Sequence, residues 1–365
     1  MNGGYYPQHI RRKYNKPLLM QNFRNFRSRA PLRLGLAGGG TDLSPYSDLY
    51  GGAVLNLTIG RYANASLKLT ESDTVRINSL DGGYSDEFPV GRLPINGPHA
   101  LAAGVYNRIV KDYLHGQGFG AEICTSIDAP QGSGLGASSA LTVALVDVFR
   151  VAFGLPLGEY DVAHLAFEIE RLDLGLAGGK QDQYAASFGG INFIEFLAQD
   201  RVIVNPLRIS ESMLNDLQAA IVICFSGQSR ASETVIKAQV SSITAEDPVV
   251  LASLHKLKED AREMKLALSR GDFSALARVL NESWKAKKAT AQGVSNAQID
   301  QLWEIAHRNG AFAGKVSGAG GGGFVMFLVD PDARTRLFGA LAQAGGVPDG
   351  ITLTSKGVES WPTRI

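Results

Sequence analysis

The chain has 365 residues, of which 45% are hydrophobic and 19% are charged, and its formal net charge is +1. This apolar content excludes a disordered protein, and the length suits about two domains. The longest apolar run, Phe324–Val329, is far shorter than the span of about 18 residues that crosses a membrane, so we expect no membrane partner. Cys124 and Cys224 form no CxxC spacing, which argues against a disulfide framework or a zinc module and indicates a reducing cytoplasm.

The N-terminal segment is basic. Residues 1–41 contain eight lysines and arginines and no acidic residue. A transit peptide or a nucleic-acid-binding arm shares this pattern. The segment lacks the apolar core of a secretory signal, and the later basic residues have no interleaved aromatic platform. We therefore expect residues 1–27 to be a basic extension of the fold, compatible with disorder, and we expect no nucleic-acid partner.

Strand and helix patterns alternate along the first half of the chain. β-Branched and apolar residues predict strands at 30–36, 52–69, 74–78, 121–129 and 188–196. Helical spacing of apolar residues predicts helices at 98–115, 137–153 and 159–173. The helix at 137–153 has the clearest pattern, since Leu141, Leu145 and Val148 lie on one stripe and Gly154 follows the last residue.

The second half of the chain contains longer helices. We expect strands at 219–225 and 324–329, and helices at about 230–241, 248–269, 273–289, 296–309 and 332–345. No internal repeat or low-complexity tract is present. We therefore divide the folded part near residue 200, into one domain at 28–200 and a second at 201–365.

A glycine-rich segment at 130–140 joins the strand at 121–129 to the helix at 137–153. Its glycines allow backbone amides to gather around an anion, and the helix N-terminus adds a partial positive charge. No Gly-Lys-Ser/Thr follows, so it is not a Walker A loop. The alternative is a plain glycine turn with one serine capping the helix. That alternative gives the second serine and the alternating glycines no role, so we expect phosphate binding.

Two further glycine clusters lie at strand ends. Residues 317–323 match G-x-G-x-x-G, but they precede a strand, whereas a dinucleotide-binding loop follows one and opens a helix. We therefore exclude a Rossmann dehydrogenase and interpret the cluster as a wall close to a substrate, with a bulged turn as the alternative. Residues 38–42 place a carboxylate beside backbone amides, which suits a polyol ligand; a helix cap by Thr41 or Asp42 is the alternative.

Two acidic residues are candidates for metal binding and proton transfer. Glu170 shares a helical column with small apolar residues, and Asp182 does so if 180–188 is helical. A buried carboxylate needs a partner, and a cation is one. Each alone is typical of a cap or an ion pair, but together, downstream of a phosphate loop, they suit a metal ligand and a base. The six histidines form no HxxxH pair, which argues against a zinc enzyme.

The glycine-rich segments, in this order, resemble the GHMP kinase family of small-molecule kinases. The likeness spans roughly residues 28–330, with signatures at 31–42, 130–140 and 315–323. It implies an α+β fold of two domains, the first like ribosomal protein S5 domain 2 and the second ferredoxin-like. It also implies a kinase that uses ATP and Mg²⁺.

The resemblance also implies roles for individual residues. Asp182 would take the proton from the acceptor hydroxyl, and Arg33 would keep Asp182 ionised. Ser139 and Glu170 would hold Mg²⁺, with Ser138 as the alternative hydroxyl. The residues implied at the ATP phosphates are Gly132, Ser133, Gly134, Leu135, Gly136, Ala137 and Ser138. Those implied at the acceptor are Gly39, Gly40, Thr41, Asp42, Arg230, Gly318 and Gly320.

Within the family, residues 37–42 and 225–230 are similar to sugar-1-kinases that act on D-glycero-D-manno-heptose 7-phosphate. This likeness implies phosphorylation at C1 of a phosphosugar, for nucleotide-heptose synthesis and surface polysaccharide. Arg230 is the first candidate for binding the 7-phosphate, and Lys237 and Arg61 are others. An L-fucose-type kinase and a non-catalytic sugar sensor on the same fold are the alternatives. A homodimer is compatible with the sequence.

Overall fold

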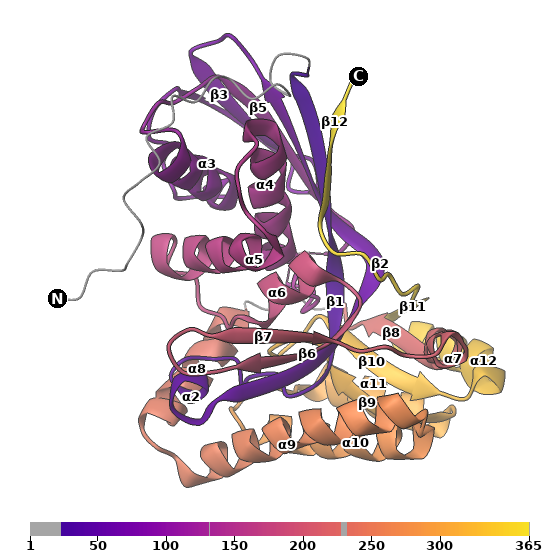
Figure 1. The fold of residues 1–365 in the computed structure, drawn as a ribbon. Helices are drawn as coiled ribbons and strands as arrows, with labels where there is room; N and C mark the ends of the chain where they lie inside the picture. Colours follow the sequence, from indigo (N-terminus) through magenta and orange to yellow (C-terminus); the bar gives the residue numbers. More distant parts are fainter. Residues whose placement is uncertain (1–22, 131, 228–231, 365) are drawn as a thin grey trace.

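The computed structural model describes residues 23–130, 132–227 and 232–364. Within these ranges the chain forms two β-sheets with helices packed on them (Figure 1). None of the helices in this part of the chain is both long and apolar enough to cross a membrane.

The first sheet has eight strands in the order β12-β1-β2-β5-β3-β4, and β6 and β7 continue from β2. The strands are β1 (Asn25–Ala37), β2 (Gly52–Leu69), β3 (Thr74–Ser79), β4 (Tyr84–Pro89), β5 (Ala121–Ile127), β6 (Ile191–Phe196), β7 (Val202–Pro206) and β12 (Glu359–Thr363). β2 is long enough to pair with β6 over its first third and with β5 near its end. The pairing is antiparallel except between β3 and β5.

Helices that follow β2 cover one side of this sheet (Figure 1). They are α3 (Ala100–Tyr113), α4 (Ala137–Phe153), α5 (Glu159–Glu168), the π-helix η1 (Ile169–Asp173) and α6 (Gln181–Phe188); the short α2 (Tyr46–Tyr50) precedes β2. α4 packs against β1 and β2 and against α3, α5 and α6, which explains why nearly all of its residues are buried. The second half of β1 is buried as well, because α4, α9 and α10 all contact it.

The second sheet has four antiparallel strands in the order β11-β8-β10-β9. Its strands are β8 (Ile221–Phe225), β9 (Ala311–Val316), β10 (Phe324–Val329) and β11 (Val347–Gly350). The helices of this half are α7 (Glu211–Ala220), α8 (Ser232–Thr244), α9 (Pro248–Arg270), α10 (Phe273–Lys288), α11 (Ala297–Arg308), the 3₁₀-helix η2 (Pro331–Ala333) and α12 (Arg334–Gln343). β10 is buried at every position, as expected for an all-apolar strand between two neighbours.

Three differences from the sequence-based expectations concern the start of the first sheet, the domain division and the helix at 159–173; in addition, strands such as β7 and β9 were not expected. β1 begins at Asn25, so residues 25–27 belong to the sheet and not to an extension; residues 1–22 lie outside the described part of the chain. The division near residue 200 falls between β6 and β7, which pair with each other, and β12 returns to the first sheet. The expected helix at 159–173 is α-helical only to Glu168 and continues as a π-helix.

Candidate active site

The three glycine-rich loops meet at one cleft of about 430 Å³. Elements of both sheets line it: Arg33 comes from β1 and Lys315 from β9. Glu170 from η1 and Asp182 from α6 also lie on its wall. The cleft therefore collects most of the residues that the sequence singles out, although they are separated by up to about 280 positions in the chain.

The loop before α4 presents backbone amides to this cleft. Gly136 is the N-cap residue of α4 and has φ +76°, a left-handed conformation that favours glycine. The 17-residue helix behind it is fully formed, so its N-terminal amides and dipole can attract an anion. Leu135 is different from its neighbours, because its side chain is buried in the core and does not line the cleft. Its carbonyl accepts the backbone N–H of Arg33 at 3.0 Å, which fastens the loop to β1.

The loop at 317–323 packs directly on the loop that precedes α4. A Cβ on Gly318 would lie 2.7 Å from the carbonyl oxygen of Gly134, so the two backbones touch only because both positions are glycine. The N–H of Phe324 donates to the carbonyl of Ser133 at 2.9 Å. Gly318 lines the cleft, whereas Gly320 packs on Val294 and does not. Gly318 thus serves the contact between the two loops.

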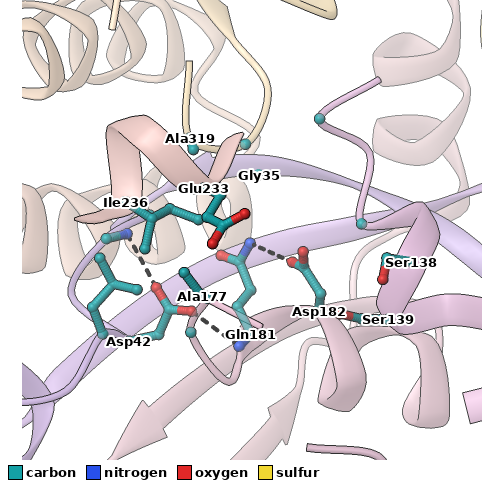
Figure 2. A pocket seen from close by; sticks show the side chains of 18 of the residues that line it. Gly35, Asp42, Ser138, Ser139, Ala177, Gln181, Asp182, Glu233, Ile236 and Ala319 are labelled. Carbon is teal, nitrogen blue, oxygen red and sulfur yellow. Dashed lines mark hydrogen bonds between the residues drawn. The ribbon is translucent and has the colours of Figure 1, made fainter. Parts of the chain in front are cut away.

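Asp182 lies in the first turn of α6 and faces Gly136 in the loop before α4. Arg33 Nε donates to its Oδ1 at 2.7 Å, and the side-chain amide of Gln181 donates to the same oxygen at 3.2 Å. The other carboxylate oxygen lies against Gly136, where a Cβ would be only 3.2 Å away. Figure 2 shows Asp182 between Gln181 and Ser138. One oxygen is thus held by donors, and the second is placed beside the start of α4, where it can accept a proton.

Arg33 links this carboxylate to the loop before α4 and to the loop at 317–323. Its Nη1 donates to the carbonyl of Gly134 at 2.6 Å and to the hydroxyl of Ser317 at 3.4 Å. The guanidinium is 5% exposed, so its charge is little screened by water. The expected pairing of Arg33 with Asp182 is therefore present.

Glu170 is fully buried, and the π-turn of η1 places it at the cleft. The Ser138 hydroxyl donates to Glu170 Oε1 at 2.9 Å, and the Gln183 amide donates to Oε2 at 2.5 Å. Ser139 is 3% exposed and accepts a hydrogen bond from the same amide, whereas Ser138 is exposed. Ser138, the alternative hydroxyl, is therefore better placed in the cleft than Ser139.

The Glu170 carboxylate and the Ser138 hydroxyl fit a hard cation such as Mg²⁺, because both groups bind a metal through oxygen. Among the described residues, no group of three or more His, Cys, Asp or Glu side chains could hold a metal ion. A cation held by Glu170 and Ser138 would complete its ligands with phosphate oxygens and water, which is common for Mg²⁺.

The residues expected at the acceptor divide into two groups. Gly39, Gly40 and Asp42 line the cleft, and the Asp42 carboxylate accepts the backbone N–H groups of Gly40 at 3.1 Å and Gln181 at 3.0 Å (Figure 2). Asp42 thus caps the start of α6, which was the alternative interpretation, while it also borders the cleft. Thr41 is buried and bonded to the backbone of Ala53, away from the cleft.

The two described candidates for binding a second phosphate, Lys237 and Arg61, lie outside the cleft. Arg230 lies outside the described residues. Lys237 pairs with Glu233 at 2.6 Å, and Arg61 pairs with Asp349. Neither Lys237 nor Arg61 lines the cleft.

Two buried lysines in the cleft were missed by the sequence reasoning. Lys287 is 4% exposed and Lys315 is 5% exposed, and both line the cleft. Lys287 was detectable, because it continues the apolar face of α10 that contains Leu280 and Trp284. Lys315 was detectable as the one charged residue in the strand that precedes the last glycine cluster.

Comparison with known proteins places the chain among small-molecule kinases. The model for the GHMP kinases N terminal domain matches residues 100–190, and that for GHMP kinases C terminal matches residues 264–347. D-glycero-alpha-D-manno-heptose 7-phosphate kinase of Campylobacter jejuni is 42% identical over 93% of this chain and 99% of that protein. The crystal structure of a D-glycero-D-manno-heptose 1-phosphate kinase from Bacteroides thetaiotaomicron has a TM-score of 0.79 and 41% identity, covering 93% of this chain and all of that one.

A more distant relative is the L-fucokinase/L-fucose-1-P guanylyltransferase of Bacteroides fragilis. It is 24% identical over 91% of this chain, which spans 38% of that longer protein.

Proposed function

The chain belongs to the GHMP kinase family, and we propose that it transfers the γ-phosphate of ATP to the C1 hydroxyl of D-glycero-D-manno-heptose 7-phosphate. The observation that carries this proposal is the position of Asp182, which Arg33 holds against Gly136 at the start of α4. A base next to an anion-binding helix N-terminus is what phosphoryl transfer to a hydroxyl requires.

On the nucleotide side, the backbone amides of residues 132–138 and the N-terminus of α4 bind the phosphates of ATP. The chain has no Walker lysine, so these dipoles carry more of the charge compensation. Glu170 and Ser138 would hold Mg²⁺, which would supply positive charge to the phosphate oxygens. Arg33 adds a further positive charge between the loop and Asp182.

On the acceptor side, the oxygen of the anomeric hydroxyl bonds to the γ-phosphorus, and Asp182 accepts the proton of that hydroxyl. The bond from the γ-phosphorus to the bridging oxygen breaks, and ADP leaves with that oxygen. Asp42 accepts hydroxyl groups of the sugar, because each carboxylate oxygen has a lone pair left beyond its backbone partner.

The choice of acceptor is supported by the heptose-phosphate kinases at 41–42% identity. The names of these two kinases differ in the position of the phosphate on the acceptor, which is at C7 in one and at C1 in the other. We propose the 7-phosphate because its C1 hydroxyl is free to accept. The product, a heptose 1,7-bisphosphate, then suits the synthesis of nucleotide-activated heptose for surface polysaccharide.

The test is ADP release with Mg-ATP and a panel of acceptors, followed by NMR of the product. The panel contains heptose 7-phosphate, heptose 1-phosphate, unphosphorylated heptose, L-fucose and mevalonate. Fastest turnover of heptose 7-phosphate, with the new phosphate on C1, is the expected result. Preference for heptose 1-phosphate or L-fucose contradicts the acceptor. ATP binding without ADP release from any acceptor supports the non-catalytic sensor instead.

A further inference from the structure

Two buried ammonium groups line the cleft near the glycine-rich segment at 38–42. Lys287, in the last turn of α10, donates from Nζ to the carbonyl of Gly39 at 2.9 Å. Lys315, on β9, donates from Nζ to the carbonyl of Gly35 at 2.9 Å. An ammonium group has three N–H donors. Among the described residues, each of these two has that single hydrogen bond, so further donors are free for a ligand.

The charges around these lysines do not balance. Lys287 lies near Asp42 and Arg33, and Lys315 lies near Lys287, Arg33 and Asp260. Arg33 is already paired with Asp182, and Asp260 is paired with Lys256 at 2.6 Å. Of the neighbouring acidic residues named here, only Asp42 is left to balance the two positive charges of Lys287 and Lys315.

The imbalance has a measurable consequence. Burial lowers the pKa of Lys287 to about 8, and burial together with the charges of Lys287 and Arg33 lowers that of Lys315 to about 7. A buried cation without an equal counter-charge is costly, and an anionic ligand removes this cost.

The positions of residues along β1 show how far Lys315 lies from the proposed reaction centre at Asp182. Arg33, which holds Asp182, is followed two residues later by Gly35, whose carbonyl binds Lys315. Two residues of a strand span about 7 Å, and Gly39, the partner of Lys287, lies further along the same segment. A sugar whose reacting hydroxyl lies at Asp182 can therefore reach the two lysines with its other end.

We infer that Lys287 and Lys315 together bind the phosphate group that the acceptor sugar already carries, at the end of the cleft opposite the hydroxyl that reacts. This inference rests on the proposed function, because only a phosphorylated acceptor has such a group. The alternative is that the lysines only brace the backbone of residues 35–39, in which case phosphorylated and unphosphorylated sugars depend on them equally.

The experiment compares Lys287→Met and Lys315→Met with the wild-type chain, on heptose 7-phosphate and on unphosphorylated heptose at saturating Mg-ATP. We expect kcat/KM for heptose 7-phosphate to fall by about 30-fold or more in each variant, mainly through KM, since a charged partner is removed. We expect kcat/KM for unphosphorylated heptose to stay within about threefold of wild type. Lys288→Met removes the adjacent, exposed lysine of the same helix and leaves both values unchanged.

The outcomes separate this inference from the proposed function. If wild type does not prefer the phosphorylated sugar, the proposed acceptor is wrong. If wild type prefers it and the variants keep that preference, the inference alone is wrong. Equal losses of kcat/KM on both sugars would mean that the lysines only brace the backbone. A raised KM for Mg-ATP would mean that they bind the nucleotide. Either result overturns the inference.

Two further measurements cover a variant that does not fold. Lys287→Arg keeps the charge and is expected to retain most of the preference for the phosphorylated sugar. Inorganic phosphate is expected to inhibit the wild-type chain in competition with heptose 7-phosphate and not with ATP. Inhibition that competes only with ATP contradicts the subsite.

Discussion

Arg33 on β1 and Asp182 on α6 form an ion pair in the cleft, with Nε 2.7 Å from Oδ1. The same guanidinium donates to the carbonyl of Gly134 in the loop before α4. The proposed base and the proposed nucleotide site are therefore positioned by one side chain. A shift of β1 would move both together, which preserves the distance between them.

Replacing Asp182 by asparagine should remove the proton acceptor with little change in shape. We expect kcat to fall by about 100-fold or more, which is the usual contribution of a general base, while the Kd of ATP changes only a few-fold. Initial rates and ATP titration measure the two quantities. Asp216→Asn, at an exposed site on α7, is the control. Near-normal kcat in Asp182→Asn would show that the base is elsewhere.

Ser138 and Ser139 are neighbours with different surroundings, which gives a matched pair of alanine variants. Ser138→Ala removes the exposed hydroxyl that contacts Glu170. We expect it to raise the Mg²⁺ concentration for half-maximal activity by about tenfold, since one oxygen ligand is lost. Ser139→Ala, in a buried position, should change this value less than threefold. The reverse order in a Mg²⁺ titration would return the ligand role to Ser139.

Gly134→Ala tests the contact between the two glycine-rich loops. The new Cβ would lie 2.5 Å from the Ser317 carbonyl oxygen, at a residue with φ +74°. We expect a loss of about 1–3 kcal/mol in the free energy of unfolding and a higher KM for Mg-ATP. Gly339→Ala is the control, because Gly339 lies in α12 with open space around it and should gain about 0.5–1 kcal/mol. Urea unfolding measures both, and an unchanged Gly134→Ala would mean that the loops can separate freely.

Lys315 predicts a pH dependence of stability. Its pKa is lowered from 10.5 to about 7 by burial and by the charges of Lys287 and Arg33, against the opposing effect of Asp260. Between these two values the unfolded chain binds more protons than the folded one, so stability rises with pH. Wild type should therefore gain roughly 3–5 kcal/mol relative to Lys315→Met between pH 7 and pH 10.5. Urea unfolding of both proteins across this range checks the slope, and parallel curves would contradict it.

Local patterns predict the core elements well. α4 and β10 were both expected with the bounds that the structure shows. Each has apolar residues at the positions that become buried, so its own sequence indicates both its type and its burial. The N-terminal residues of β1 were missed, since their partner β12 lies more than 300 positions later. β7 and β9 were missed because proline, lysine and glycine interrupt their apolar patterns.

At the site, too, local sequence patterns predict the burial of single residues but not the contacts between distant segments. The helical column of Glu170 predicted its burial, and the structure confirms that burial. The π-turn that carries Glu170 has no signal in a helical pattern, so the choice between Ser138 and Ser139 needed the fold. The local patterns of α10 and β9 indicate that Lys287 and Lys315 are buried, but they do not show that both ammonium groups reach the cleft, where they bind the carbonyls of Gly39 and Gly35.

The return of β12 to the first sheet has a consequence for biosynthesis. Residues 25–29 of β1 pair with residues 359–363, which are synthesised more than 300 residues later. Until then, this part of β1 has an open edge, which is a site where other extended chains can add. A truncated chain that lacks residues 359–363 is therefore expected to keep this edge open and to associate more readily than the full chain.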